Sequence, residues 1–250
     1  MAVVSNLVRR ACPEISYLGG LFYFAPQTLA RAAELGLSPS QFYFVGRAGV
    51  LGNVGAAVAD SALGYFAPSV VVRHWEAASK VLPPSQIAAA YLECCREFGR
   101  HHLSGEDWLG PLCAAAESVL NAASPVALPL FAAVKALRLA EDLAAKAMQL
   151  VTSLREFRGG VHLMAIVASG LEPRVAHWLT RPDAWENFGY QPSDIPEVGE
   201  EHRQRLMRAD ELTDELTAPA FSVLDEPATE ALLTGLEAMR VRLPLPEFPD

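Results

Sequence analysis

Apolar residues recur at helical spacing over most of this chain, whereas the alternating pattern of a β-strand is hard to find. Leu130, Val134 and Leu137, for example, fall on one face of a helix. The spacing continues through Val151, so the helix that Pro129 opens is predicted to be the longest. We therefore expect an all-α fold, organised as a multi-helix bundle.

Prolines and small polar residues mark where other helices begin, because proline in the first turn loses no hydrogen bond and a polar side chain can cap it. Pro26 is predicted to open a helix that ends at Gly36, and Ser38 precedes the next one. The sequence Tyr-Phe-Ala-Pro, at 23–26 and again at 65–68, is interpreted as a repeated helix entry. Further predicted helices begin at Asn53, Pro68 and Ser85 or cover 201–216 and 227–241.

Two regions are predicted along the chain: an N-terminal helical region, 1–152, and a C-terminal region, 153–250, which can also form one continuous domain with the first. Within the second region, 182–202 holds six acidic residues and no Lys or Arg, and is predicted to be an irregular surface connector. The proline-rich end of the chain, 244–250, is predicted to be extended.

Residues 162–181 can be written as a helix, a turn at Gly170 and a second helix, which is the arrangement of a helix-turn-helix motif. Ala176 and Leu179 then fall where the second helix faces inward. The acidic connector follows where a winged-helix protein has a basic hairpin, so the motif is predicted to be degenerate and DNA contact disfavoured. Its candidate DNA-contacting residues are Arg174, His177 and Arg181.

Composition narrows the class of protein. The chain has 250 residues, 51% of them hydrophobic and 20% charged, which allows a sizeable core and argues against intrinsic disorder. A formal net charge of −9 disfavours nucleic acids and anionic membranes as main partners. The four cysteines are irregularly spaced, which does not fit a disulfide framework. The sequence also shows no apolar secretory signal and no uninterrupted apolar run long enough to span a membrane, so we expect a cytoplasmic protein.

The segment around Gly159 and Gly160 is predicted to be a tight turn between two helices, because paired glycines allow backbone angles that side chains forbid. Arg158 precedes the glycines and His162 follows them. In a functional interpretation, His162 is a general base or a metal or haem ligand, and Arg158 orients an anionic group. In a structural interpretation, Arg158 caps carbonyl groups and His162 bonds to the backbone.

A second candidate lies in the glycine-rich stretch 41–57, where Arg47 is predicted to occupy a loop among apolar residues. Burying an unpaired charge is costly, so this arginine must pair, reach solvent, or receive a carboxylate or phosphate. Tyr23, Tyr43 and Phe44 are candidates to line the same pocket, although aromatic residues on helix faces are often core.

Other chemistry is less well supported. Cys94, Cys95, His101 and His102 lie close in the sequence, but their spacing does not fit a closed zinc site, and a helix end explains them better. The motifs of common hydrolases and metalloproteases are absent from the sequence. No metal site is therefore predicted from this cluster.

Several short motifs occur in order: YFAP, FYFVGRAGVLGNVG, FAP with an Arg, LREFRGGVH-x5-ASGL and ELTDELTAPAFSVL. Over about 23–236 they resemble the SalTR-like helix-turn-helix proteins of actinobacteria. The resemblance implies an all-helical N-terminal region, a winged-helix-like segment and a distant similarity to MarR-type regulators. The glycine turn departs from the family pattern, because Phe157 replaces its first His and Gly160 its Asp, while His162 still matches.

Three functions remain as hypotheses. The favoured one is a cytoplasmic small-molecule-binding protein on a degenerate helix-turn-helix scaffold. The first alternative is a DNA-binding regulator, MarR-like, whose dimer presents Arg174 and Arg181 to DNA grooves. The second is an enzyme of specialised metabolism that uses His162 as a base or as a haem or metal ligand. The predicted pocket is lined by Tyr23, Tyr43, Phe44, Arg47, Arg158 and His162.

Overall fold

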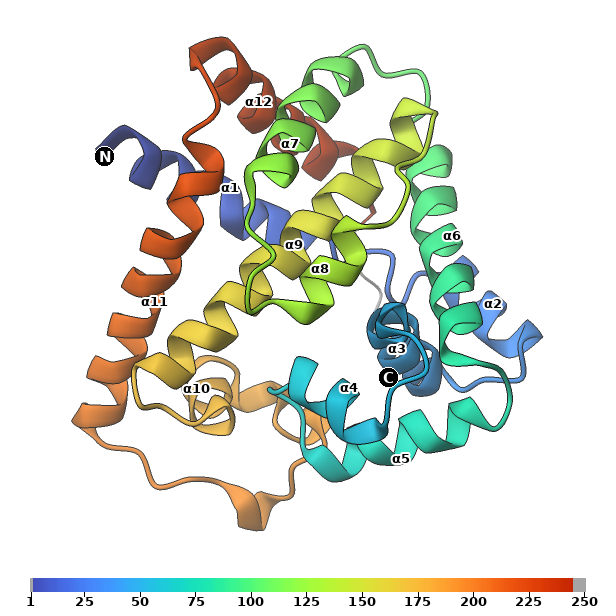
Figure 1. Cartoon of the computed structure of the whole chain (residues 1–250), viewed down its shortest axis with the longest axis vertical. Coiled ribbons are helices and arrows are strands. Elements are labelled where there is room, and N and C mark those ends of the chain that lie inside the picture. The colour runs from blue at the N-terminus through green and yellow to red at the C-terminus, as the bar shows by residue number, and fades with distance from the viewer. Residues whose placement is uncertain (1, 245–250) are drawn as a thin grey trace.

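One long helix, α9 (Leu143–Ala168), crosses the centre of the computed structural model, which describes residues 2–244 and their side chains from residue 4 (Figure 1). Within these residues the regular structure is entirely helical, which confirms the predicted all-α class. The other α-helices are α1 (Ala2–Leu18), α2 (Pro26–Glu34), α3 (Pro39–Ala48), α4 (Ala56–Ala62), α5 (Pro68–Ser79), α6 (Pro84–Leu103), α7 (Leu109–Ala122), α8 (Pro129–Lys135), α10 (Pro173–Thr180), α11 (Glu200–Phe221) and α12 (Glu226–Arg242). Short 3-10 helices are η1 (Gly49–Leu51), η2 (Pro182–Ala184), η3 (Glu186–Phe188) and η4 (Pro192–Asp194).

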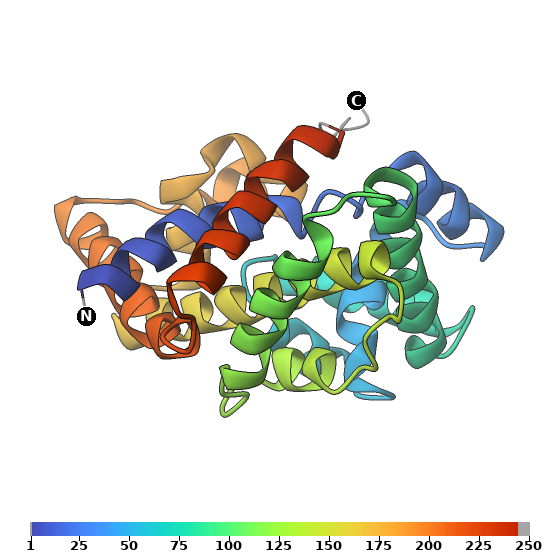
Figure 2. The ribbon, with the colours of Figure 1, turned by 90° about the horizontal axis from the view of Figure 1, so that it is seen from above.

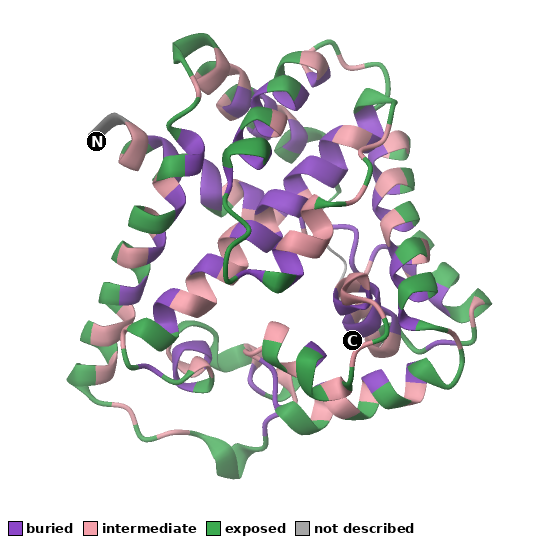
Figure 3. Cartoon of the chain, in the orientation of Figure 1, coloured by how far each residue is buried: buried purple, intermediate pink, exposed green. Residues whose placement is uncertain are grey.

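The main core surrounds α9, which packs against α1, α6, α7, α8 and α11. Seen from above, α12 lies across α1 and α7 and closes the bundle on that side (Figure 2). Buried residues line the helix faces that look toward α9, and exposed ones lie on the outer faces (Figure 3). The boundary predicted at residue 152 falls inside α9, which continues across it without a break.

Local signals explain most helix starts. Proline occupies the first turn of α2 and α5, as predicted from Pro26 and Pro68. Ser38 caps α3 through a reciprocal pair of hydrogen bonds with Gln41. Two other predicted caps are wrong, because α4 begins after Gly55 and α6 after Pro83 rather than at Asn53 and Ser85.

The long helix predicted from Pro129 is in fact two helices, α8 and α9. The break persists because buried Gln149 holds the intervening segment: its amide nitrogen donates to the carbonyl of Arg138 (3.1 Å), and its amide oxygen accepts from the backbone N–H of Ala140 (3.1 Å). Asp142 then caps α9 by accepting a hydrogen bond from the N–H of Ala145 (2.9 Å). The apolar residues keep helical spacing across the break, so the sequence pattern did not show that a second helix begins at Leu143.

The predicted turn at Gly159 and Gly160 is also wrong, since both lie within continuous α9. A Cβ added to Gly160 would come within 2.9 Å of Leu128, whereas one added to Gly159 would meet nothing. The lack of a side chain at Gly160 therefore allows α9 to pack closely against the segment before α8. No special backbone angle is needed at this position.

The predicted helix-turn-helix motif is present. α9 ends at Ala168, Gly170 takes a left-handed conformation (φ +71°), and α10 follows. The end of α9, α10 and α11 share a small core of their own, in which Ala176 is buried and Leu179 partly buried, as predicted. The segment 181–199 contains η2, η3 and η4 and no strand, so this described part of the chain has no wing hairpin.

No single described helix is long and apolar enough to cross a membrane, and only α3–η1 together with α4, a pair bent by 96°, passes that length and composition test. Of the proline-rich end predicted to be extended, 245–250 lie outside the described residues.

Candidate functional site

A buried ion pair joins two distant parts of the sequence at the centre of the molecule. Arg47 on α3 donates from Nη2 to Oε2 of Glu156 on α9 (2.9 Å) and from Nε to Oε1 (3.1 Å). The side chains are 13% and 8% exposed. Two parallel hydrogen bonds of this kind fix the guanidinium against the carboxylate. Arg47, whose charge was predicted to need a partner, is therefore paired within the protein by Glu156.

Arg47 lies in a helix and not in the predicted loop, because α3, which begins after Ser38 as predicted, continues through Arg47 to Ala48. Its neighbour Gly46 faces α6, where an added Cβ would come within 2.4 Å of the ring of Tyr91. An added Cβ at Gly49 would come within 2.3 Å of the carbonyl oxygen of Pro84, so Gly46 and Gly49 allow α3 and η1 to pack closely on α6.

Tyrosines complete the surroundings of the pair. The hydroxyl of Tyr23 donates to Oε1 of Glu156 (3.0 Å), and Nη1 of Arg47 donates to the hydroxyl of Tyr43 (2.7 Å). Burial raises the pKa of Tyr23, so its hydroxyl stays protonated. Burial also works to raise the pKa of Glu156, but the charge and hydrogen bonds of Arg47 outweigh it and hold that pKa below its ordinary value. The pair is therefore ionised at neutral pH.

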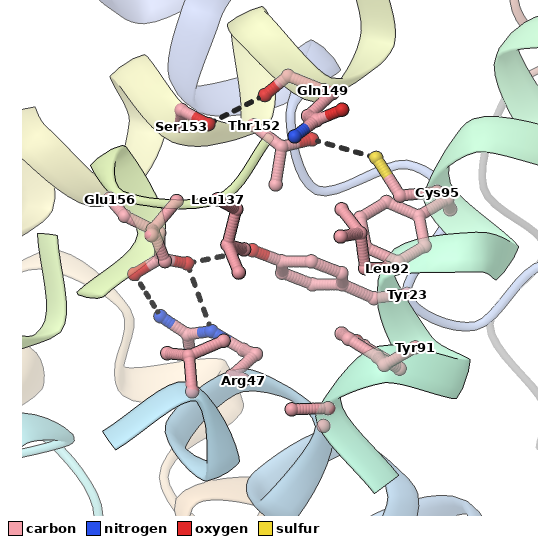
Figure 4. A pocket seen from close by; sticks show the side chains of 15 residues that line it. Tyr23, Arg47, Tyr91, Leu92, Cys95, Leu137, Gln149, Thr152, Ser153 and Glu156 are labelled. Carbon is pink, nitrogen blue, oxygen red and sulfur yellow. Dashed lines mark hydrogen bonds and ion pairs between the residues drawn. The ribbon is translucent and has the colours of Figure 1, made fainter. Parts of the chain in front are cut away.

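A crevice opens directly beside this pair (Figure 4). It offers about 50 Å³ to the centres of water-sized molecules, and the hollow measures about 470 Å³ when space open to solvent is counted. Tyr23, Arg47, Tyr91 and Glu156 form its floor, and almost all of the surface that is accessible in the crevice is apolar. The partly exposed rim residues are Val50, Leu92, Val134 and Leu137. A mostly apolar hollow with a few converging polar groups is the common pattern of small-molecule sites.

Tyr91 carries an unused polar group in this crevice. The residue is only 4% exposed, yet its hydroxyl has no hydrogen-bond partner within the described chain. Its ring packs against Phe42 and Phe22, with ring centres 5.0 Å apart in each case. Leaving a buried hydroxyl unpaired costs about 1–3 kcal/mol, so the lack of a partner for Tyr91 is an unfavourable feature of this crevice.

Sequence reasoning found part of this site. Tyr23 and Arg47 line the crevice, and Tyr43 supports Arg47 from the side. Phe44 points elsewhere and packs against Phe66 and His74. Glu156 and Tyr91 were missed. Tyr91 belongs to none of the motifs found in the sequence. Glu156 lies between arginines in the LREFRGG segment, whose paired glycines predicted a turn and not a buried ion pair.

Arg158 and His162 do not share the crevice with Arg47, contrary to the hypothesis of one common pocket. Glu156 and Ser153 lie on the crevice face of α9, and Arg158 is two residues further on, about 200° around the helix. The charge of Arg158 instead acts on the Cys12 thiol of α1. His162 faces Thr213 of α11.

His162 sits in a defined hydrogen-bond chain. The hydroxyl of Thr213 donates to the carbonyl of Ala209 (2.7 Å), so Nδ1 of His162 is the donor in its 2.9 Å contact with Thr213. Burial, and then the charge of Arg158, lower the pKa of His162 to about 4. The ring is therefore neutral at pH 7, with Nε2 as a hydrogen-bond acceptor.

The candidate DNA-contacting residues differ in their surroundings. Arg181 is exposed, and Arg174 is exposed but paired with Glu172 (2.8 Å). His177 is buried and stacks on Phe188, with ring centres 3.9 Å apart, so the prediction that it reaches phosphate or bases is wrong. Residues 172–215 carry eleven Asp or Glu against five Arg, a net charge of −6 on the helix-turn-helix side.

The residues described here include no group of three or more His, Cys, Asp or Glu side chains placed to hold a metal ion. Cys95 lies in the crevice wall, where its thiol contacts the hydroxyl of Thr152 (3.5 Å), and burial raises its pKa to about 12. The thiol therefore stays protonated and behaves as a wall group.

Comparison with protein families gave one informative result. The model of a helix-turn-helix family matches residues 8–244, which is nearly the whole chain. Neither the search of curated proteins nor the search of solved structures gave a match.

Proposed function

This chain belongs to a helix-turn-helix family, and we propose that it is a cytoplasmic protein that binds a small molecule in the crevice beside Arg47 and Glu156. One observation carries the proposal: the hydroxyl of Tyr91 is buried at the crevice floor beside an ionised pair, and it has no hydrogen-bond partner among the described residues. A ligand polar group placed there satisfies that hydroxyl, and its apolar part contacts the rim.

The helix-turn-helix motif supports a regulatory use of the bound molecule, because α9 belongs to both places. Thr152, Ser153 and Glu156 of α9 line the crevice, and Ala165 and Ile166 of the same helix belong to the core of the motif. A displacement of α9 by a ligand is therefore transmitted directly to the packing of α10.

Native mass spectrometry of the purified protein tests for a bound molecule, and thermal-shift screening identifies binders. We expect Leu137→Trp, which fills the mouth of the crevice, to abolish their binding. Leu139→Trp is the matched control, since Leu139 is also partly exposed and lies outside the crevice lining. Binding that survives Leu137→Trp unchanged would contradict the proposed site.

A second candidate function is DNA binding by a SalTR-like or MarR-like regulator, in which a homodimer presents Arg174 and Arg181. The family match and the exposed arginines of the motif favour it, while the net charge of −6 on residues 172–215 opposes it. Gel shifts with genomic fragments from the regions flanking the gene test this function at about 50 mM salt, where phosphate contacts are strongest. Binding lost in Arg174→Ala with Arg181→Ala would support it, and no shift at that salt would remove it.

A further inference from the structure

Two guanidinium groups and one carboxylate lie at the crevice floor or against the ring of Tyr23, which belongs to that floor. Arg155, next to Glu156 on α9, places its guanidinium carbon 5.3 Å from the ring centre of Tyr23, and Arg47 places its own at 5.6 Å from that ring. Among the described residues no carboxylate pairs with Arg155, and its buried Nε has no hydrogen-bond partner. Two guanidinium groups thus lie against one ring, and the carboxylate of Glu156 pairs with only one of them, Arg47.

The crevice floor also holds hydrogen-bond donors that have no acceptor among the described residues. Nη1 and Nη2 of Arg47 each carry two hydrogens, and each uses one, on Tyr43 and Glu156 respectively. Burial keeps the hydroxyl of Tyr91 protonated, because it raises its pKa well above the ordinary value. Three N–H or O–H hydrogens, two on Arg47 and one on Tyr91, are therefore left without an acceptor among the described residues.

We propose that the ligand is an amphiphilic acid whose carboxylate accepts hydrogen bonds from Tyr91 and Arg47 while its hydrocarbon part lies along the rim. The charge of the ligand balances the second guanidinium, Arg155, across the ring of Tyr23. A neutral head group would leave that charge uncompensated, and an ammonium group would add to it. This inference rests on the proposed small-molecule site and specifies the chemical class that the site takes.

Three probes with the same eight-carbon skeleton separate charge from shape: octanoate, octanamide and octylamine, measured by isothermal titration calorimetry at pH 7.5. We expect octanoate to bind at least tenfold more tightly than octanamide, and octylammonium not to bind. Arg155→Met is expected to reduce the affinity for octanoate about tenfold and to leave octanamide unchanged, because only the anion uses the extra charge. The matched control is Arg73→Met, an exposed arginine on α5.

Tyr91→Phe tests the hydroxyl, and it should weaken octanoate and octanamide alike, since both accept a hydrogen bond. Equal affinities of the unaltered protein for octanoate and octanamide would overturn the inference about charge and leave the proposed site in place. If the unaltered protein binds none of the three probes at millimolar concentration and releases no small molecule in native mass spectrometry, both proposals fail. The octanoate-to-octanamide ratio is measured on the unaltered protein, so it does not depend on whether a variant folds.

Discussion

Replacing Glu156 with Gln tests whether the Arg47–Glu156 pair organises the centre of the molecule. The substitution keeps the size of the side chain and an acceptor for Tyr23, but leaves the buried guanidinium of Arg47 without a counter-charge. Removing one partner of a buried ion pair costs about 3–5 kcal/mol, and we expect the lower end because Gln retains one hydrogen bond. For a chain of this length, about 3 kcal/mol corresponds to a fall in Tm of about 6–12 °C.

The penalty should depend on pH in a defined direction. The pKa of Glu156 is lowered in the folded protein, so its carboxylate stabilises the fold above the unfolded value, near 4.5, and this contribution is lost as pH falls through the folded pKa. The difference in stability between the unaltered protein and Glu156→Gln should therefore be constant from about pH 5 to 8. It should shrink as the pH falls from the unfolded pKa toward the lower folded pKa, because the unfolded chain then takes up a proton that the folded protein does not.

Urea denaturation followed by circular dichroism at pH 7 and at pH 4 measures both effects. Glu34→Gln is the matched control, since Glu34 forms an exposed pair with Arg31 (2.7 Å) and such pairs contribute about 0–1 kcal/mol. The double variant Arg47→Met with Glu156→Leu should recover most of the lost stability, because no buried charge remains. A cost below about 1 kcal/mol for Glu156→Gln at pH 7 would refute the reasoning, since Arg47 would then be finding water or another partner.

Three further predictions follow from single contacts. Gly159→Ala should stabilise the protein by about 0.5–1 kcal/mol in urea denaturation, as expected for open space within a helix, whereas Gly160→Ala should not, because its methyl meets Leu128. The pKa of His162 falls from 6.5 to about 4 on folding, so the free energy of unfolding should decrease by about 3 kcal/mol as the pH drops from 6.5 to 4. Unfolding measured over this pH range should show a weaker pH dependence in His162→Gln. Phe188→Ala should cost about 3 kcal/mol and speed amide exchange over 182–194, because its ring stacks on Phe66 at 4.2 Å; unchanged exchange would contradict this.

Local signals in the sequence predicted much of the fold. Proline in a first turn, the Ser38–Gln41 cap and the glycine after α9 are each set by neighbours within a few residues, so the helices and the helix-turn-helix motif were found. The wrong predictions concern places where a contact between residues far apart in the sequence determines the local structure. Gln149 interrupts the helix predicted from Pro129, and close packing on Leu128 explains a glycine that had indicated a turn.

The site was only half predictable for the same reason. The cost of an unpaired buried charge indicated that Arg47 needs a partner, but the partner lies 109 residues away and nothing local identifies it. The direction in which each side chain points depends on α9 continuing through Gly159. Glu156 and Arg158 are two residues apart on this helix, so they face different neighbours. Arginine and histidine flanking a predicted turn had indicated one shared pocket, and a continuous helix separates them.

The repeated Tyr-Phe-Ala-Pro sequence acquires a second meaning in the structure, beyond helix entry. Its first copy supplies Tyr23 to the crevice floor, and its second supplies Phe66, which stacks on Phe188 of the connector. Aromatic contacts run without a gap from Tyr43, which holds Arg47, through Phe66 (5.9 Å) and Phe188 (4.2 Å) to His177 on α10 (3.9 Å). The crevice is thus joined to the second helix of the motif by this stack as well as by α9. Because close-packed groups cannot shift independently, we expect a ligand that moves Arg47 to change the packing of α10 along both connections.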